Sequence, residues 1–455
     1  MSPTTMLRTC AVAGITAFML ILCGCQGLQN AGGGTTGPTG SINSINHIVF
    51  MVQENRSFDM QFGQLPAYWA ANGLPTQQLD GLPANASNPS FDGTSTISAF
   101  HVATSCIQNL SPSWDESHVD WNRADPTSAT PMLDGFVYNA AKYAMTPPPG
   151  EGPIFDTIGA RAMGYYDGTD LNYYYFMASN FATSDRWFSP VLSRTQVNRM
   201  YLLAGTSQGY AYPPSAPLTA NNIFGLLQSA GISWKIYETD PNSTYLSYFQ
   251  TFYNQFAATN VVPASQFVID AQNGTLPAVA LIEGGYNSGL DEHPKNNVQN
   301  GAMYASGLIN GLMNSMSWKD SAFILTYDEA GGFYDHVAPQ PAVNPDGIAP
   351  MDLPPGDICT GAGGANCDFN YTGYRIPMLV ISPFTKKSYV SHTVADYTAI
   401  LKFIETRFGL ASLTKRDAAQ IDMTEFFDFQ NVPWATPPAP PAQNTSLTCN
   451  YQTLQ

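Results

Sequence analysis

Residues 45–59 read INHIVFMVQENRSFD, and the remainder of the chain can be interpreted around them. An apolar run at 48–52 has the β-branched and aromatic side chains of a buried strand, and it ends abruptly before Glu54 and Asn55. A second segment far along the chain, AFILTYDEAGG at 322–332, has the same form. Because ligands of open α/β sheets bind beyond the carboxyl ends of the strands, the two segments predict one shared site for a metal ion or a reacting phosphate.

The first 25 residues have the pattern of an export signal rather than of a folded element. One charged residue, Arg8, precedes an apolar run at 11–22 that is too short for a typical membrane span. The run ends in LCGC, which resembles the lipobox of bacterial lipoproteins. We therefore predict a lipoprotein signal peptide at 1–24 and a lipid on Cys25, and hence an exported protein anchored to a bacterial membrane, in the periplasm or at the cell surface. An ordinary signal peptide is the alternative interpretation.

Residues 25–44 are rich in Gly, Thr and Asn and predict a flexible tether. The chain of 455 residues is 44% hydrophobic and 11% charged, which allows a large buried core. Its net charge of −16 predicts that nucleic acid is not a partner, since that binding depends on Lys and Arg neutralising phosphates. A small phosphate ester can still be held by a metal ion and a few local donors.

Strand-like and helix-like segments alternate beyond the tether, and no internal repeat is present. The apolar patterns predict strands at 233–238, 278–283, 322–327 and 376–381. They predict helices at 298–316 and 395–408. Such alternation indicates βαβ units and a mainly parallel sheet. We expect an α/β fold with one domain at 45–435, over which a Pro-rich C-terminal tail at 436–455 wraps.

Four cysteines remain beyond the export signal: Cys106, Cys359, Cys367 and Cys449. Four cysteines in an exported protein indicate two disulfides. Cys359 and Cys367 flank a Gly-rich loop and predict one pair, whereas the pairing of Cys106 and Cys449 stays open. Metal ligation is the alternative, although the spacings fit no zinc pattern.

Several polar clusters carry potential chemistry. Residues 184–201 include the hydroxyl groups of Ser193 and Thr195, in a basic setting that contains Asn198. A hydroxyl nucleophile is weak at neutral pH and needs a base or a metal to activate it, and the carboxylates after the two strands suit metal activation. Histidine occurs in two further clusters, WDESH at 114–118 and DEHP at 291–294.

Four motifs in this chain together resemble the phosphoesterase family, which contains bacterial phospholipases C and acid phosphatases and belongs to the alkaline phosphatase superfamily. They are ENRSFD at 54–59, TxxNRxY at 195–201, EHP at 292–294 and TYDExGGxYDHV at 326–337. Each motif is weak alone, but their order and their span over most of the mature chain make the resemblance specific. It implies an alkaline-phosphatase-like fold: a central, mostly parallel sheet sandwiched by helices in a single large domain.

The resemblance implies one divalent metal ion, held by Glu54, Asn55, Asp328 and Glu329. Oxygen-rich ligation suits a hard cation such as Ca²⁺, Mg²⁺ or Mn²⁺ and is compatible with Zn²⁺ or Fe. His336 is expected to orient one of the ligand carboxylates. A simple turn is the structural alternative for Asp328 and Glu329 before the two glycines.

By the same resemblance, Thr195 takes the place of the nucleophile, and Ser193 is the nearby substitute. Attack by Thr195 on phosphorus would give a phospho-threonine that water then hydrolyses. The implied substrate contacts are Asn55, His118, His293 and Arg199, of which the two histidines would donate to phosphate oxygens or protonate the leaving alkoxide. Pairing with an acidic ligand is the alternative role of Arg199. Gln196 and Val197 replace a Pro-containing pair of many members, so the conformation of this loop is left open.

These expectations predict a lipid-anchored, metal-dependent hydrolase of phosphoric esters, with a phosphate ester such as a phospholipid as substrate. A phospholipase C-like phosphodiesterase and an acid phosphatase both fit, with a lean toward the former, because the two share the core motifs and differ in the pocket walls. A non-catalytic, surface-anchored protein that binds phosphate or metal is the alternative from another class. The hydroxyl of Thr195 beside the implied ligands argues against that alternative.

Overall fold

The computed structural model describes residues 40–361 and 363–455. The predicted signal peptide and the lipidated Cys25 lie outside these residues, so both stay predictions. The end of the predicted tether is described, and it forms a short 3-10 helix, η1 (Ile42–Ser44). Ile42 packs against the hydrophobic core, so the folded part begins slightly before residue 45.

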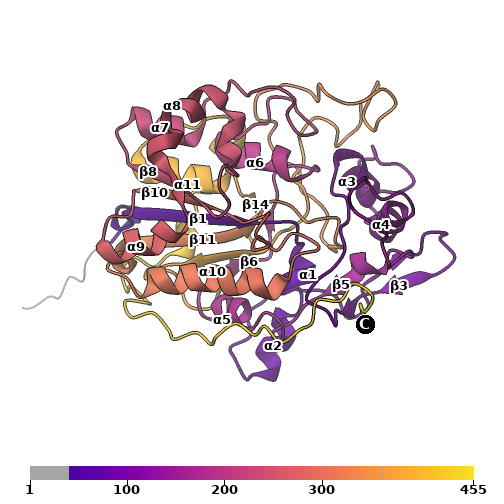
Figure 1. Cartoon of the computed structure of the whole chain (residues 1–455), viewed down its shortest axis with the longest axis horizontal. Helices are drawn as coiled ribbons and strands as arrows, with labels where there is room; N and C mark the ends of the chain where they lie inside the picture. The colour runs from indigo at the N-terminus through magenta and orange to yellow at the C-terminus, as the bar shows by residue number, and fades with distance from the viewer. Residues whose placement is uncertain (1–39, 362) are drawn as a thin grey trace, which may run out of the picture. The chain divides into compact units, whose positions relative to one another are not determined.

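A central sheet of eight strands has the order β13-β6-β12-β11-β1-β10-β8-β9 (Figure 1). The strands are β1 (His47–Gln53), β6 (Ala182–Ser184), β8 (Trp234–Glu238), β9 (Val261–Pro263), β10 (Val279–Glu283), β11 (Ser321–Tyr327), β12 (Met378–Ile381) and β13 (Tyr389–Ser391). In this sheet β12 is antiparallel to both of its neighbours, and the other pairings are parallel. The predicted α/β class with a mostly parallel sheet is therefore confirmed.

β1 lies in the middle of the sheet because both of its faces are apolar. Residues 48–52 have no exposed surface, and β10 and β11 flank β1 in parallel. The register pairs Gln53, the last residue of β1, with Tyr327, the last residue of β11. Glu54 and Asp328 therefore leave the sheet side by side at its carboxyl edge.

Helices cover both faces of the sheet (Figure 1). Side chains alternate along β1, so its residues enter two separate hydrophobic clusters. Val49 and Met51 share one cluster with side chains of α5 (Asn172–Asn180), α9 (Ser265–Asn273) and α10 (Val298–Met313). Ile48 and Phe50 share the other with side chains of α6 (Thr195–Ala204), α7 (Ile223–Ser229) and α11 (Ala399–Phe408).

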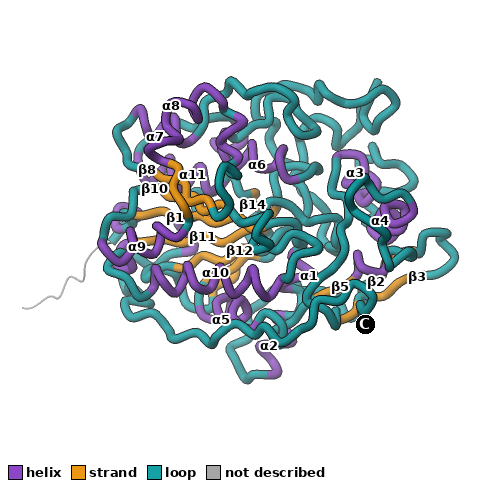
Figure 2. The backbone as a smooth tube through the Cα atoms, in the orientation of Figure 1, coloured by secondary structure: helices purple, strands orange, loops and turns teal. Residues whose placement is uncertain are grey.

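The remaining elements lie in the connections, where loops predominate (Figure 2). The helices are α1 (Phe58–Phe62), α2 (Leu65–Ala71), α3 (Trp114–Trp121), α4 (Phe136–Met145), α8 (Gln250–Asn260) and α12 (Lys415–Ala418), with 3-10 helices η2 (Ala160–Met163), η3 (Tyr245–Tyr248), η4 (Trp318–Asp320) and η5 (Thr424–Phe426). Short strands pair two by two: β2 (Ser87–Pro89) with β3 (Thr96–Ser98), β4 (Phe100–His101) with β5 (Gly164–Tyr165), and β7 (Trp187–Phe188) with β14 (Ala395–Asp396). Within the described ranges, none of the helices combines the length and apolar character needed to cross a membrane.

Two helices are shorter in the structure than the sequence predicts. α10 ends at Met313, and Ser315 Oγ just beyond it donates to the carbonyl of Leu312 at 2.7 Å. The helix predicted at 395–408 begins only at Ala399, because Asp396 belongs to β14 and its carboxylate accepts the Thr398 N–H at 2.8 Å. In both places a side chain bonds to nearby backbone and competes with the helix.

The structure contains two disulfides, as the number of cysteines predicts. Cys359 and Cys367 form the expected pair, and Cys106 bonds to Cys449 across 343 residues of sequence. The second bridge lies near the end of the Pro-rich tail, which runs past α10 and α5 (Figure 1). Asn172 of α5 also holds this tail, donating through Nδ2 to the carbonyl of Ala442 at 2.8 Å.

Removal of the long-range bridge (Cys106→Ser with Cys449→Ser) should lower the free energy of unfolding more than removal of the short one (Cys359→Ser with Cys367→Ser). In the chain-entropy model, stabilisation rises with the logarithm of the loop that the bond closes; for loops of 343 and 8 residues the difference is about 3 kcal/mol. Urea unfolding of both double variants under non-reducing conditions measures the two losses. An equal loss, or a greater loss for the short loop, would contradict this expectation.

Candidate active site

The four predicted metal ligands meet at the ends of β1 and β11. Glu54 and Asn55 follow β1, Asp328 and Glu329 follow β11, and all four side chains are buried. The Asn55 N–H donates to Asp328 Oδ1 at 2.8 Å, which joins the two segments directly. Asn55 has a φ of 60°, a left-handed conformation in which asparagine is favoured over most other residues. The two polar segments therefore form one compact site, as the sequence predicts.

Gly331 allows the two segments to approach so closely. Its φ is 71°, and a Cβ atom at this position would lie 2.4 Å from the carbonyl oxygen of Asn55. The Gly331 N–H donates to Glu329 Oε2 at 2.5 Å. The segment after β11 is thus a turn, as one interpretation of the sequence has it, and the same turn orients a carboxylate of the site.

Thr195 is the first residue of α6, and its hydroxyl points at the carboxylate cluster. Its Oγ1 lies 3.4 Å from Glu54 Oε2 and 3.3 Å from Asn55 Oδ1. Asn198 fixes the preceding loop: its Oδ1 accepts the Val191 N–H at 3.1 Å, and its Nδ2 donates to the Ser193 carbonyl at 2.6 Å. This bonding explains why Asn stands three residues after Thr in the motif.

Two other hydroxyl groups near Thr195 are engaged elsewhere. Ser193 Oγ is buried and donates to the Ala211 carbonyl at 2.6 Å, so it does not face the carboxylates in this structure. Residues 205–209 read GTSQG and match the G-x-S-x-G pattern of serine esterases. Ser207 is fully buried, however, and donates to the Tyr210 carbonyl at 2.7 Å, and the segment follows a helix rather than a strand. Thr195 is the hydroxyl that the fold brings to the site.

Arg199 lies one turn after Thr195 on α6 and pairs with two carboxylates. Its Nη2 is 3.0 Å from Glu54 Oε1, and its Nη1 is 3.3 Å from Glu283 Oε2. Burial alone would lower the pKa of Arg199, but Glu54 and Glu283 together raise it above its usual value. The side chain is only 1% exposed. The structure thus supports the pairing role that the sequence left open and corrects the assignment of Arg199 as a substrate contact.

Several oxygens of the site lack partners within the described part of the chain. Asp328 Oδ2 and Glu329 Oε1 are buried and accept no hydrogen bond. Burial and the charge of Glu54 raise the pKa of Asp328 to about 7. Burial and the charge of Asp328 raise the pKa of Glu329 well above its usual value. Unsatisfied buried oxygens in a set of carboxylates and an amide are what a divalent cation requires, so these residues fit a metal ion.

His293 is attached to the same edge of the sheet. The Glu54 N–H donates to the Asp291 carbonyl at 2.8 Å, and the His293 N–H donates to Asp291 Oδ1 at 3.0 Å. His293 Nδ1 lies 2.9 Å from the Pro294 carbonyl, which fixes the ring orientation. The side chain is half-buried, so one edge of the ring is accessible.

His118 does not point into the site. It is fully buried in α3, with Nδ1 2.6 Å from the Trp114 carbonyl and Nε2 3.3 Å from the Asn366 carbonyl. Burial lowers the pKa of this ring below its usual value. With both nitrogens facing main-chain carbonyls, His118 has a structural position, and its predicted contact with phosphate is not supported.

His336 also differs from expectation. Its Nδ1 lies 2.7 Å from Asp59 and its Nε2 3.1 Å from Asp80, and neither is a predicted metal ligand. Asp59, Asp335 and His336 lie close enough together to hold an ion, but Arg375 already pairs with both carboxylates, at 2.9 and 2.8 Å. The group is therefore neutralised by protein charge, and His336 orients no ligand of the carboxylate cluster.

A second group that could hold an ion is His101 with Asp167 and Asp170, which lies partly exposed on the connection near α5. His101 is 41% exposed, and its Nε2 lies 2.7 Å from Asp170. The hydrogen bond with Asp170 raises the pKa of His101, which favours an ion pair between the two side chains. Neither of these two groups contains a hydroxyl nucleophile.

Three residues of the site are given no role on the basis of the sequence. Tyr245 of η3 donates to Glu54 Oε1 at 2.9 Å. Glu283, the last residue of β10, holds the other side of Arg199. Asp291 supports both Glu54 and His293, and its Oδ2 is buried without a partner. The sequence could have indicated Glu283, which ends a predicted strand, and Asp291, which belongs to the DEHP cluster at 291–294. Tyr245 carries no local signal.

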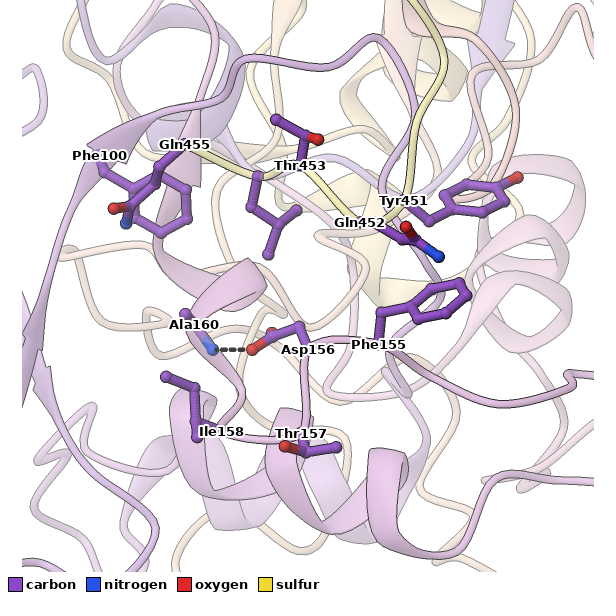
Figure 3. A pocket seen from close by; sticks show the side chains of 11 residues that line it. Phe100, Phe155, Asp156, Thr157, Ile158, Ala160, Tyr451, Gln452, Thr453 and Gln455 are labelled. Atoms are coloured by element: carbon purple, nitrogen blue, oxygen red, sulfur yellow. Dashed lines mark hydrogen bonds between the residues drawn. The ribbon is translucent and has the colours of Figure 1, made fainter.

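One open cavity of the described chain is separate from this chemistry. It has about 470 Å³ and lies between the 155–160 segment and the C-terminal tail (Figure 3). Its lining includes Phe100, Phe155 and Leu454, and its only charged lining residue is Asp156, which accepts the Ala160 N–H at 3.2 Å. A cavity with one carboxylate and no cation is unsuited to a phosphate group.

Replacement of Arg199 by Met should lower the free energy of unfolding by about 3–5 kcal/mol, because Glu54 and Glu283 would stay buried without a counter-charge. Urea unfolding of the metal-free protein measures the loss. Arg199→Met with Glu283→Gln should recover part of it, since one uncompensated charge is removed. Unchanged stability in Arg199→Met would contradict the assigned pairing role.

Comparison with known proteins identifies the relatives of this chain. Phospholipase C B of Mycobacterium tuberculosis is 31% identical over 447 residues, a match that covers 88% of this chain and 80% of the relative. Non-specific phospholipase C4 of Arabidopsis thaliana is 29% identical, covering 82% and 70%. Non-hemolytic phospholipase C of Burkholderia pseudomallei is 27% identical, covering 87% and 61%.

Solved structures give weaker matches. A protein of the alkaline phosphatase superfamily from Vibrio parahaemolyticus aligns with a TM-score of 0.33 and 12% identity over 79% of this chain and 78% of its own. The lipoteichoic acid synthase LtaP of Listeria monocytogenes aligns with a TM-score of 0.35 and 14% identity, covering 57% and 70%. Scores this low carry no argument, so the fold class rests on the sheet itself.

The family assignment rests on the sequence. The model of the Phosphoesterase family matches residues 45–411, a range that contains all four motifs and the complete carboxylate cluster. This range also contains Thr195, Arg199 and His293. The chain therefore belongs to the Phosphoesterase family and is a hydrolase of phosphoric esters.

Proposed function

We propose that Thr195 is the nucleophile of this hydrolase and that it works beside one divalent metal ion. The observation that carries the proposal is the position of Thr195 Oγ1, within 3.4 Å of Glu54 and Asn55 at the edge where Asp328 and Glu329 have unpartnered oxygens. A free threonine hydroxyl is a weak nucleophile, and a metal ion bound by the neighbouring carboxylates would activate it.

The metal ion would be held by Glu54, Asn55, Asp328 and Glu329. When bound, it would lower the pKa of the Thr195 hydroxyl and neutralise charge on the phosphoryl oxygens. Carboxylate and amide oxygens suit a hard cation such as Ca²⁺, Mg²⁺ or Mn²⁺, with Zn²⁺ and Fe as further candidates.

The reaction would proceed in two displacements. Thr195 Oγ1 gives up its proton to solvent and forms a bond to phosphorus, while the bond from phosphorus to the leaving oxygen breaks and His293 protonates the alkoxide. Water then attacks phosphorus and gives one proton to His293, while the bond from phosphorus to Oγ1 breaks and Oγ1 takes up a proton from solvent, which balances the proton released in the first step. The contact between His293 Nδ1 and the Pro294 carbonyl supports this role, because it turns Nε2 away from the main chain.

We infer that the substrate is a phosphodiester of the phospholipid class. The support is that the relatives reported above are named phospholipase C. A lipid anchor at Cys25, which remains a prediction, would hold the enzyme beside such a substrate. Hydrolysis of phosphomonoesters, as by an acid phosphatase, is the second candidate, because the same core residues serve both reactions.

Thr195→Ala should lower kcat by about 10³-fold or more, because the group that bonds to phosphorus is lost. Ser193→Ala is the matched control and should change kcat little, since that hydroxyl bonds to the Ala211 carbonyl. Hydrolysis of p-nitrophenylphosphorylcholine and of p-nitrophenyl phosphate, each with and without chelator, measures both effects.

The outcomes separate the candidates. Preference for the choline diester supports a phospholipase C, and preference for the monoester supports a phosphatase. Full activity of the Thr195→Ala variant would exclude Thr195 as the nucleophile. Phosphate or metal binding without turnover of either ester would favour the non-catalytic alternative.

A further inference from the structure

We propose that Arg194 binds a non-bridging oxygen of the phosphoryl group and stabilises the charge that develops during its transfer. This inference rests on the proposed function of the same site, and it adds a substrate-binding residue where Arg199 and His118 prove to be occupied. Its basis is the position of Arg194, its lack of a partner and the charge of its surroundings.

Arg194 stands directly before Thr195, as the residue that precedes the first turn of α6. Its main chain is held by Asn198, whose N–H and Nδ2 both donate to the Arg194 carbonyl, at 3.2 and 3.4 Å. Its side chain does not cap the helix. The backbone of Arg194 is thus locked to the nucleophile loop, while its guanidinium is left for another partner.

The guanidinium of Arg194 is unpaired within residues 40–361 and 363–455. Its Nε is buried without a hydrogen-bond partner, and no described carboxylate lies within 4.0 Å of the group. Four of the five fully buried arginines have carboxylate partners: Arg161, Arg199, Arg375 and Arg416. The fifth, Arg56, lies over the Phe333 ring and is fully buried, so a substrate cannot reach it. Arg194 is only half-buried and accessible.

The charge of Arg194 influences the pKa of groups in and around the site. Burial and Asp328 raise the pKa of Glu329, and the charge of Arg194 opposes that rise. Burial raises the pKa of Tyr248 in η3, and Arg194 again opposes the shift. Tyr143 of α4, whose pKa burial and Glu151 raise to about 12, is affected in the same way. The geometry agrees: Arg194 is bonded to Thr195, whose Oγ1 lies 3.4 Å from Glu54 Oε2, so the Arg194 side chain leaves the main chain beside the carboxylate cluster.

The chemistry of phosphoryl transfer requires such a group. Glu54, Asp328 and Glu329 make the site negative, and Arg199 is already paired with Glu54. A phosphoryl group enters only if cations outweigh this charge, and a guanidinium can bond to two phosphoryl oxygens at once. A donor that is fixed before the reaction also avoids reorganisation as charge builds up. Because a monoester carries one more negative charge than a diester, Arg194 should matter more for monoesters.

The test compares Arg194→Gln and Arg194→Lys with Arg407→Gln in the full-length, metal-loaded protein. Arg407 is a matched control: it is half-buried as well, but it bonds to the Ile45 carbonyl before β1, at the opposite end of that strand from Glu54. Calorimetry measures the affinity for inorganic phosphate, and steady-state kinetics measures kcat/KM for the monoester and the diester. Thermal unfolding checks that each variant is folded.

Arg194→Gln should weaken phosphate binding by about 10-fold and lower kcat/KM by about 10²-fold, with the greater loss for the monoester. Arg194→Lys should recover part of both losses, because it restores the charge without the planar fork. Thr195→Ala should lose turnover but keep its phosphate affinity, which separates the binding residue from the nucleophile.

Phosphate affinity and kcat/KM in Arg194→Gln equal to those of Arg407→Gln would overturn the inference. The inference would also be overturned if Arg194→Gln and Arg194→Lys lost kcat/KM equally for both esters and both had a lower unfolding temperature. That pattern indicates a structural role. If the wild-type protein turns over neither ester, the proposed function fails, but the difference in phosphate affinity still decides whether Arg194 binds phosphate.

Discussion

Repulsion between buried carboxylates is the constraint on which the rest of this structure depends. β1 and β11 are parallel neighbours that end at the same level, so Glu54, Asp328 and Glu329 cannot separate without breaking the sheet. Burial and this crowding raise the pKa of Asp328 to about 7. Arg199 forms ion pairs with Glu54 and Glu283, whereas no ion pair within residues 40–361 and 363–455 includes Asp328 or Glu329. The remaining charge calls for a cation, and the oxygens without partners are where one would bind.

The start of α6 packs against this cluster, with Oγ1 of Thr195, the proposed nucleophile, 3.4 Å from Glu54 Oε2. α6 begins at Thr195, so the peptide dipoles of its first turn favour negative charge on the hydroxyl oxygen or on a phosphate beside it. Asn198 holds the loop before the helix, and Arg199 holds the cluster. One short helix thereby carries Thr195, the proposed nucleophile, together with Asn198 and Arg199, and Arg194 stands at its start.

Local patterns made part of this arrangement predictable. The ends of β1 and β11 can be recognised because an apolar run followed by carboxylates is a contiguous signal. Thr195 is assigned only through the resemblance of its motif to the phosphoesterase family. Tyr245 cannot be predicted, because it reaches Glu54 through a connection whose path no local pattern determines. His118 and His336 are misassigned for a related reason: a histidine near acidic residues looks the same in sequence whether its ring faces a site, a carbonyl or another ion pair.

The most direct test of the account is anomalous diffraction from crystals of the protein loaded with Mn²⁺. The account predicts one strong peak that contacts Glu54, Asp328 and Glu329 beside Thr195, and loss of that peak in Asp328→Asn. The group of Asp59, Asp335 and His336 is an internal comparison, because its possible ligand atoms lie within 4.8 Å of one another but its two carboxylates already pair with Arg375. A peak at that group instead, or no peak at the ends of β1 and β11, would contradict the central claim.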